Sequence, residues 1–253
     1  MNEQIAKWEQ QFGLLRSKAI RYWNPFNRRR LMRFYSQFVQ PNSLTFDIGA
    51  HLGDRLDAWR GLQSKVIALD PQPLCYNYLK RNFGNDSEVV ILPHAVGESI
   101  GRMKMHISSH YPTVSTLASQ DWRNALNNAS NAEVTWDKEM EVEVTTLDFL
   151  IEKYGMPDFC KIDVEGFEVN VLEGLSKPIP TLSFEFLSTM PKGRKRCFEL
   201  LSELGNYKYN WAIEEKRDLV FKESVEASEL LKSIDKFGTH AFSGDIYAKL
   251  IKD

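Results

Sequence analysis

The chain has 253 residues with a formal net charge of −2, 26% charged residues and 43% hydrophobic residues. This size suits one large domain with a substantial core, and the near-neutral charge argues against a nucleic-acid surface spread over the whole domain. No apolar stretch approaches the roughly 18 residues of a membrane span, and the first residues lack the pattern of a secretory signal. The three cysteines lie far apart, without the spacing of a zinc site or a disulfide framework. We therefore expect a cytoplasmic protein with no membrane span and no nucleic-acid partner.

Two amphipathic helical stretches are predicted at the N-terminus. Apolar residues recur every three or four positions within residues 1–23, and Asn24-Pro25 should end that helix. A second stretch follows at 31–38, and Pro41 should stop it. We predict that residues 1–42 form a helical appendage, which could also pair two copies of the chain in a homodimer.

From residue 44 onward, short apolar runs alternate with helical segments. The predicted strands are LTFDIGA, KVIALD, EVVILPHAV, DFCKIDVEG and TLSFEF, and the predicted helices lie near 54–62, 73–83, 146–154, 167–175 and 192–204. A charged helical stretch at 223–236 precedes a last predicted strand, AFSGDIYAKLI. This alternation indicates an α/β domain over 43–253, with a mostly parallel sheet and helices on both faces.

The stretch LTFDIGAHLGD, at 44–54, has the pattern of a ligand-binding turn, although an ordinary strand-to-helix connection would also explain it. Asp47 closes the first strand and Asp70 the second, near the spacing at which an acid reaches a ribose. The G-x-G-x-x-G pattern that holds a pyrophosphate is absent, and Asp47 would repel phosphate but favour a cation. These features indicate a ligand with positive charge beside a ribose. S-adenosylmethionine, with an adenosine, a sulfonium and an ammonium, has these properties.

An ordered set of segments resembles the FkbM-type methyltransferases of the class I S-adenosylmethionine-dependent superfamily. The segments are FDIGAHLGD, IALDPQP, LPHAVGE, VTTLDFL, PDFCKIDVEGFEVNVLEGL and LSFEF, within residues 44–213, and KIDVEGFE followed by VLEGL is the most specific. The chain departs from the family pattern at Asp70, where Glu is common, and at His94, where a small polar residue is frequent. The resemblance implies a Rossmann-like class I methyltransferase fold with a mostly parallel seven-stranded sheet, and S-adenosylmethionine as cofactor.

We expect the cofactor at the carboxyl ends of the first strands. Asp47 should complement its cationic amino-acid end, Asp70 should accept hydrogen bonds from the ribose, and the backbone around His94 should edge the adenine. The full set of expected cofactor-binding residues is Asp47, Gly49, Ala50, His51, Gly53, Asp70, Pro71, His94, Ala95 and Asp163.

Acidic residues cluster in KIDVEGFE, at the end of the strand that should lie beside the cofactor. Asp163 is the leading candidate for the base that takes a proton from a hydroxyl, followed by Glu165 and then by Glu185 in LSFEF. The structural alternative is that Glu165 and Glu168 stabilise a helix N-terminus through its dipole, with Glu168 favoured for this role and Lys161 as an exposed neighbour. Carboxylates also suit Mg²⁺, but we assign no metal site.

These features predict O-methylation of a hydroxyl on a sugar, a polyketide or another small metabolite. The strand end reads IDVEG and lacks the Asn/Asp-Pro-Pro-aromatic turn of nucleobase methyltransferases, which disfavours DNA or RNA as the acceptor. One alternative is a nicotinamide-dependent oxidoreductase, because Asp70 would also serve that cofactor's ribose. Another is a non-catalytic S-adenosylmethionine-binding protein that contacts partners through its N-terminal helix.

A long polar insertion, 108–139, lies between two further predicted strands at 103–107 and 140–146. A connection longer than about 12–15 residues is more often a lid or binding loop than idle chain, although a disordered surface insertion is the alternative. We expect the insertion to close over the acceptor, using Tyr111, Ser115, Thr116, Trp122, Asn124, Asn127 and Trp136.

Overall fold

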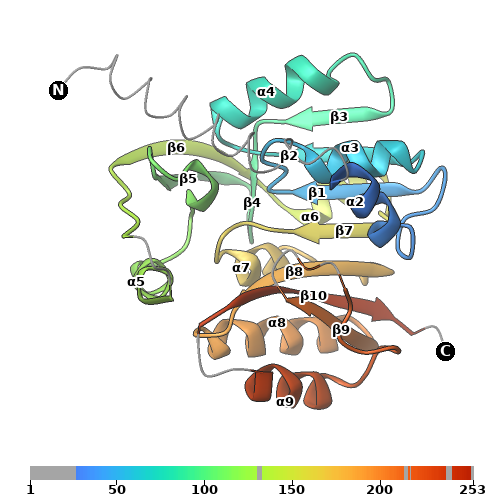
Figure 1. Cartoon of the computed structure of the whole chain (residues 1–253). Coiled ribbons are helices and arrows are strands. Elements are labelled where there is room, and N and C mark those ends of the chain that lie inside the picture. The colour runs from blue at the N-terminus through green and yellow to red at the C-terminus, as the bar shows by residue number, and fades with distance from the viewer. Residues whose placement is uncertain (1–26, 130–132, 214–215, 217, 238–240, 252–253) are drawn as a thin grey trace.

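The computed structural model describes residues 27–129, 133–213, 216, 218–237 and 241–251. It contains a seven-stranded sheet with helices on both faces and a smaller sheet beside it (Figure 1). The helix predicted within 1–23 lies outside the described residues, so the homodimer contact expected from it stays a prediction. Among the described residues, no helix combines the length and apolar character needed to cross a membrane.

The large sheet is mostly parallel and has the order β3-β2-β1-β7-β8-β10-β9. Only its last strand in sequence, β10, runs antiparallel to both of its neighbours. The chain moves outward from β1 to β3 and then returns to the other side of β1, and ligands of such sheets bind where the order reverses. The strands are β1 (Leu44–Ile48), β2 (Lys65–Leu69), β3 (Val89–Leu92), β7 (Phe159–Ile162), β8 (Thr181–Leu187), β9 (Tyr207–Ile213) and β10 (Ser243–Leu250).

Alternation along the strands divides the core between two faces. In β1, Phe46 and Ile48 belong to the larger apolar cluster, whereas Thr45 and Asp47 alternate with them toward the other face. The larger cluster lies under α6 (Leu147–Tyr154), α7 (Glu168–Glu173), α8 (Pro191–Leu204) and α9 (Ala227–Phe237). The smaller cluster lies under α2 (Asn27–Tyr35), α3 (Asp54–Gly61) and α4 (Pro73–Phe83). The expected α/β sheet with helices on both faces is therefore confirmed.

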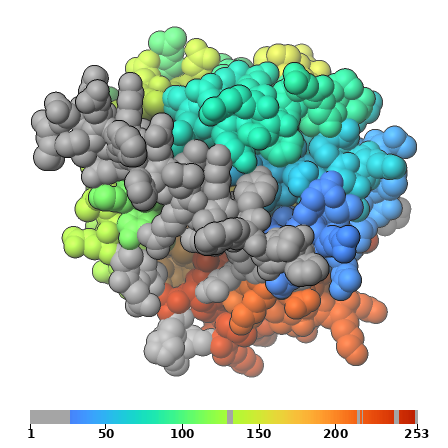
Figure 2. Space-filling model, turned by 45° about the horizontal axis from the view of Figure 1, so that its top comes forward, coloured from blue at the N-terminus to red at the C-terminus, as the bar shows by residue number. Residues whose placement is uncertain are grey.

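Helix α2 packs directly onto this second face. Phe34 contacts Tyr247 of β10 with ring centroids 5.5 Å apart, and Phe38, in the turn that follows α2, stacks on Phe159 of β7 at 5.3 Å. Figure 2 shows α2 (dark blue) and the chain around α4 (teal) on one face of the molecule. The second predicted N-terminal helix thus belongs to the domain core, and a boundary at residue 42 stays a prediction.

The smaller sheet holds β4 (Ala95–Val96), β6 (Lys138–Thr145) and β5 (Gly101–Ile107), in that order. The insertion connects β5 to β6 and contains a 3₁₀ turn, η1 (Pro112–Val114), and a helix, α5 (Gln120–Ala129). The sequence analysis identified the flanking strands but not α5. The described part of the insertion therefore has secondary structure of its own, and α5 lies to one side of the large sheet (Figure 1).

Candidate active site

The turn after β1 meets the end of β7 at the carboxyl edge of the large sheet. Gly49 has a φ of +83°, and a Cβ placed on it would lie 1.9 Å from the carbonyl oxygen of Asp163. Only glycine allows this approach. The next turn residue, His51, has a φ of +48°, and its backbone N–H donates to Asp70 Oδ2 at 3.0 Å. The turn of LTFDIGAHLGD is therefore in direct contact with Asp163, through Gly49, and with Asp70, through His51.

A pocket lies at this edge of the sheet, at the switch point where ligands of such folds bind. Most of the expected site residues line it: Gly49, His51, Asp70, Pro71, His94, Ala95, Asp163 and Glu165. Other lining residues were not anticipated from the sequence, including Arg55, Gln72, Met105, Thr113, Leu117 and Phe167.

Asp70 lies at the end of β2 with its carboxylate against the turn. Its oxygens accept from the backbone N–H groups of His51 at 3.0 Å and Gln72 at 2.9 Å. Burial raises the pKa of Asp70 to about 7, although these two hydrogen bonds favour the ionised form. The carboxylate is thus fixed in orientation at the pocket wall.

Asp47 is fully buried and does not line the pocket. Its Oδ1 lies 3.5 Å from Nε of Arg55, and burial raises its pKa to about 6 against the opposing effect of this guanidinium. Ala50 and Gly53 also lie outside the pocket lining, and Gly53 is the N-cap of α3 with a φ of +78°. A direct contact of Asp47 with the cofactor stays a prediction, because in this arrangement the carboxylate would act through Arg55.

Asp163 lies between two cations. Its Oδ2 is 2.5 Å from Nη2 of Arg55 and 3.4 Å from Nζ of Lys161, and Lys161 also donates to Oδ1 of Asp245 at 2.5 Å. The interpretation of Lys161 as an exposed neighbour is wrong, because its side chain is only 1% exposed. Two nearby cations stabilise the ionised form of Asp163.

The sequence analysis gave no role to Arg55 or Asp245. Arg55 lies in a polar helix, where an arginine is usually solvated. Asp245 is far from the other site residues in sequence, so the only signal was an acid within the apolar strand AFSGDIYAKLI. The strand register brings Asp245 to the site, because Asp245 of β10 lies directly opposite Glu185 of β8.

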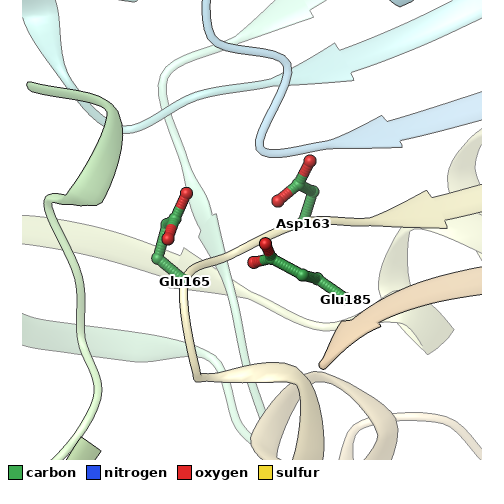
Figure 3. Close-up of side chains that lie close together, drawn as sticks. All are labelled: Asp163, Glu165 and Glu185. Carbon is green, nitrogen blue, oxygen red and sulfur yellow. The ribbon is translucent and has the colours of Figure 1, made fainter. Parts of the chain in front are cut away.

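The carboxyl groups of Asp163, Glu165 and Glu185 turn toward one another (Figure 3). One carboxylate oxygen from each residue lies within 4.8 Å of the others. Glu185, at the end of β8, is not a lining residue of the pocket, and burial together with the charges of Glu165 and Asp163 raises its pKa well above its usual range. Such a trio favours a positive charge beside it.

Glu168 stabilises the loop that carries these acids. Its Oε1 accepts from the backbone N–H groups of Val164 at 3.2 Å and Gly166 at 3.1 Å. Burial raises the pKa of Glu168 to about 7. These contacts agree with the structural role expected for this residue.

The insertion reaches the pocket with fewer side chains than expected. Ser115 lines the pocket, but Trp122 and Trp136 do not. Trp136 Nε1 donates to the carbonyl of Val114 at 2.9 Å, and Trp122 packs on Gly166. Both rings contact protein in this structure, and the expected stacking on an acceptor stays a prediction.

The two asparagines of α5 are also engaged within the insertion. Asn127 exchanges two hydrogen bonds with the backbone of Val134, and Asn124 accepts from Gln120. Neither asparagine lines the pocket, and the expected contact of their amides with acceptor hydroxyls stays a prediction.

Comparison with known families agrees with this geometry. The family model described as "Methyltransferase FkbM domain" matches residues 47–211, and the chain belongs to this family. The chain therefore carries the methyltransferase domain of a family that uses S-adenosylmethionine as its cofactor. Family membership sets aside the nicotinamide-dependent oxidoreductase.

Individual relatives are more distant. The chain is 29% identical over 136 residues to "Methyltransferase sdnD" of Sordaria araneosa, covering 46% of this chain and 52% of that protein. The chain thus spans about half the length of that relative. Among solved structures, it resembles precorrin-6y C5,15-methyltransferase from Geobacter metallireducens GS-15, with a TM-score of 0.46, 12% identity, and coverage of 89% and 87%. It also resembles TYW2 of P. horikoshii, with a TM-score of 0.44, 10% identity, and coverage of 89% and 62%.

Proposed function

We propose that this methyltransferase transfers the methyl group of S-adenosylmethionine to a hydroxyl of a small metabolite, such as a sugar or a polyketide. The observation that carries the proposal is the convergence of three carboxyl groups, from Asp163, Glu165 and Glu185, at the edge of the pocket. A hydroxyl must lose its proton as it attacks the methyl group, and a positioned carboxylate that takes this proton contributes about 10²–10⁴-fold.

The pocket supplies groups for each part of the cofactor. Asp70 would accept hydrogen bonds from the ribose hydroxyls, and the chain at His94 and Ala95 would border the adenine. Gly49 and His51 would lie beside the amino-acid end, where Arg55 links that turn to Asp47 and Asp163. Carboxylates outnumber cations around the pocket, which suits a ligand that carries a sulfonium and an ammonium.

The ion pairs distinguish the three acids. Asp163 already has two cations at Oδ2, which makes it a weak proton acceptor and a good electrostatic partner for the sulfonium. Glu185 does not line the pocket, and its raised pKa favours the protonated form, which cannot take up a proton. We therefore assign proton acceptance to Glu165, which lines the pocket, with Glu185 beside it, and assign Asp163 to charge stabilisation.

Methyl transfer is an in-line displacement. The carbon–sulfur bond breaks as the hydroxyl oxygen bonds to the methyl carbon, the sulfonium becomes a neutral thioether, and the proton goes to the carboxylate. Positioning of the two reactants can supply an effective molarity of about 10⁵–10⁸ M. The pocket wall formed by Thr113, Ser115 and Leu117 offers hydroxyl and apolar contacts to such an acceptor.

The test uses S-adenosylmethionine with an isotopically labelled methyl group. The protein is incubated with a panel of sugars, phenols and polyketide alcohols, each paired with its deoxy and amino counterpart, and products are identified by mass spectrometry. We expect label on hydroxyl compounds only. Transfer to the amino counterparts or to RNA would contradict the proposal, and cofactor binding without any transfer would favour the non-catalytic alternative.

A further inference from the structure

We propose that Thr116 and Trp122 of the insertion position Glu165, so that the insertion is a fixed part of the acid site. This inference rests on the proposed role of Glu165 at the methyl group. Neither Thr116 nor Trp122 lines the pocket, and both act on the loop that carries the acid.

Thr116 connects the smaller sheet to the acid loop. Its backbone pairs in both directions with His106 of β5, at 2.8 and 2.9 Å. Its fully buried hydroxyl donates to the carbonyl oxygen of Glu165 at 2.6 Å and accepts from the N–H of Ala118 at 2.8 Å. The hydroxyl is therefore held in one orientation, directed at the backbone of Glu165.

The loop needs such support because two successive residues have left-handed backbone conformations. Glu165 has a φ of +55°, which is uncommon for a residue with a side chain, and Gly166 has a φ of +91°. Strained conformations persist only where the surroundings determine them. Glu168 supports the loop through the N–H groups on either side of Glu165, and Thr116 supports it through the carbonyl of Glu165 itself.

Trp122 packs against Gly166, on the loop that carries Glu165. A Cβ on Gly166 would lie 2.3 Å from the indole ring, so the ring occupies the space that a side chain would take. Trp122 is 5% exposed, and its ring meets Trp136 edge to face at 6.5 Å. Since Trp136 is anchored to the carbonyl of Val114, the ring over Gly166 is itself held in place.

The same short segment faces the pocket and the loop. Thr113, Ser115 and Leu117 line the pocket, whereas Thr116 turns to Glu165. A ligand that contacts 113–117 therefore contacts the support of Glu165. This arrangement links acceptor shape to the position of the acid.

The test compares two cofactor analogues, so it needs no acceptor. S-adenosylhomocysteine lacks the methyl group and the sulfonium charge, whereas sinefungin carries an amine where the methyl group would be. The ratio of their affinities, measured by calorimetry, reports how well the carboxylates are placed around that amine. Thr116→Val should weaken sinefungin binding about tenfold and leave S-adenosylhomocysteine binding within twofold, while Thr116→Ser should preserve both.

Further variants separate positioning from stability. Thr45→Val removes another buried hydroxyl, bonded to Ser64 and to the carbonyl of Lys65, and should destabilise the fold without changing the ratio. Trp122→Phe should lower the ratio of sinefungin affinity to S-adenosylhomocysteine affinity less than Trp122→Leu does. These two variants test the inference even if Thr116→Val does not fold. In a Glu165→Gln background, Thr116→Val should add no further loss, because the two residues act through one interaction.

Two results would overturn the inference. If Glu165→Gln lowers the ratio but Thr116→Val and Trp122→Leu leave it unchanged, the insertion does not position the acid, and the proposed function stands. If Glu165→Gln itself leaves the ratio unchanged, Glu165 is not at the methyl group, and its role in the proposed function fails as well.

Discussion

Arg55 and Asp163 form a 2.5 Å ion pair that joins the first helix after the glycine turn to the end of β7. The same guanidinium lies 3.5 Å from Asp47. One arginine therefore links the carboxylates of the two most informative sequence motifs. Because all three side chains are at least four-fifths buried, this link should contribute to stability as well as to the site.

Arg55→Met should reduce the free energy of unfolding by about 3–5 kcal/mol. The substitution leaves Asp47 and Asp163 buried without their shared cation, and breaking a buried pair costs about this much. Chemical denaturation measures the change. Arg28→Met is the matched control, since Arg28 pairs with Asp57 at the surface and its loss should cost at most about 1 kcal/mol. Equal losses for the two variants would show that the Arg55 link is not a stabilising one.

Asp70→Ala should weaken binding of S-adenosylhomocysteine by about 1.5–3 kcal/mol, because it removes a charged acceptor for the ribose hydroxyls. Isothermal titration calorimetry gives the affinity directly. Asp86→Ala is the control, because Asp86 pairs with Arg60 away from the pocket lining. If both variants bind as tightly as the wild type, Asp70 is not a cofactor ligand.

The sheet and the cofactor edge could be predicted because their signals are local. Strand alternation places Phe46 and Ile48 on one face, and the acids Asp47 and Asp70 end apolar runs, so each can be located from its own segment. The partners of those acids could not be located in this way. Asp245 reaches Lys161 across 84 positions of sequence, and only the register of β10 brings them together.

The packing partners of the insertion's aromatic residues could not be located from the sequence either. The aromatic residues suggested contact with an acceptor, because aromatic rings can stack on an apolar or sugar-ring face. Trp122 finds that partner at Gly166, where the missing side chain leaves room for a ring. Composition indicates that an aromatic side chain must be buried, but the surface that buries it depends on tertiary contacts.

Glu165→Gln should reduce turnover on a hydroxyl acceptor by about 10²–10⁴-fold while S-adenosylhomocysteine affinity stays within threefold, because the amide cannot accept the proton. Asp163→Asn should also slow turnover, but it should weaken S-adenosylmethionine more than S-adenosylhomocysteine, since it removes charge near the sulfonium. Steady-state rates and calorimetry on both variants provide the comparison. Wild-type turnover in Glu165→Gln would transfer the role of base to another residue.

Removing divalent metal ions should leave turnover unchanged. Three carboxylate oxygens lie close enough to hold a cation, but Oδ2 of Asp163 is already within ion-pair distance of Arg55 and Lys161. Two fixed cations compete with a metal at that oxygen and lower the negative charge that would attract it. Rates are compared before and after dialysis against EDTA, and again after addition of Mg²⁺. A loss on dialysis that Mg²⁺ reverses would show that the acidic trio is a metal site.

The last prediction concerns pH. Burial raises the pKa of Asp70 to about 7, so in the ligand-free protein this carboxyl is half protonated near neutrality. Ribose hydroxyls that donate to it favour the ionised form, so below pH 7 the cofactor must displace a proton to bind. By linkage, affinity should fall by up to about tenfold for each unit of pH below 7, with release of up to one proton.

The stability of the ligand-free protein should change in the opposite direction. The folded-state pKa of Asp70 lies above its unfolded value, so its contribution to stability is complete below about pH 4 and is lost as the pH rises through 7. Asp47 and Glu168, with raised pKa values of about 6 and about 7, titrate in the same window. The variant Asp70→Asn separates the contribution of Asp70 to cofactor binding from the titration of Asp47 and Glu168. It should flatten the pH dependence of S-adenosylhomocysteine binding between pH 5.5 and about 7.5. Calorimetry in two buffers of different ionisation enthalpy measures affinity and proton release together, and an equally steep profile in the variant would assign the titration to a group other than Asp70.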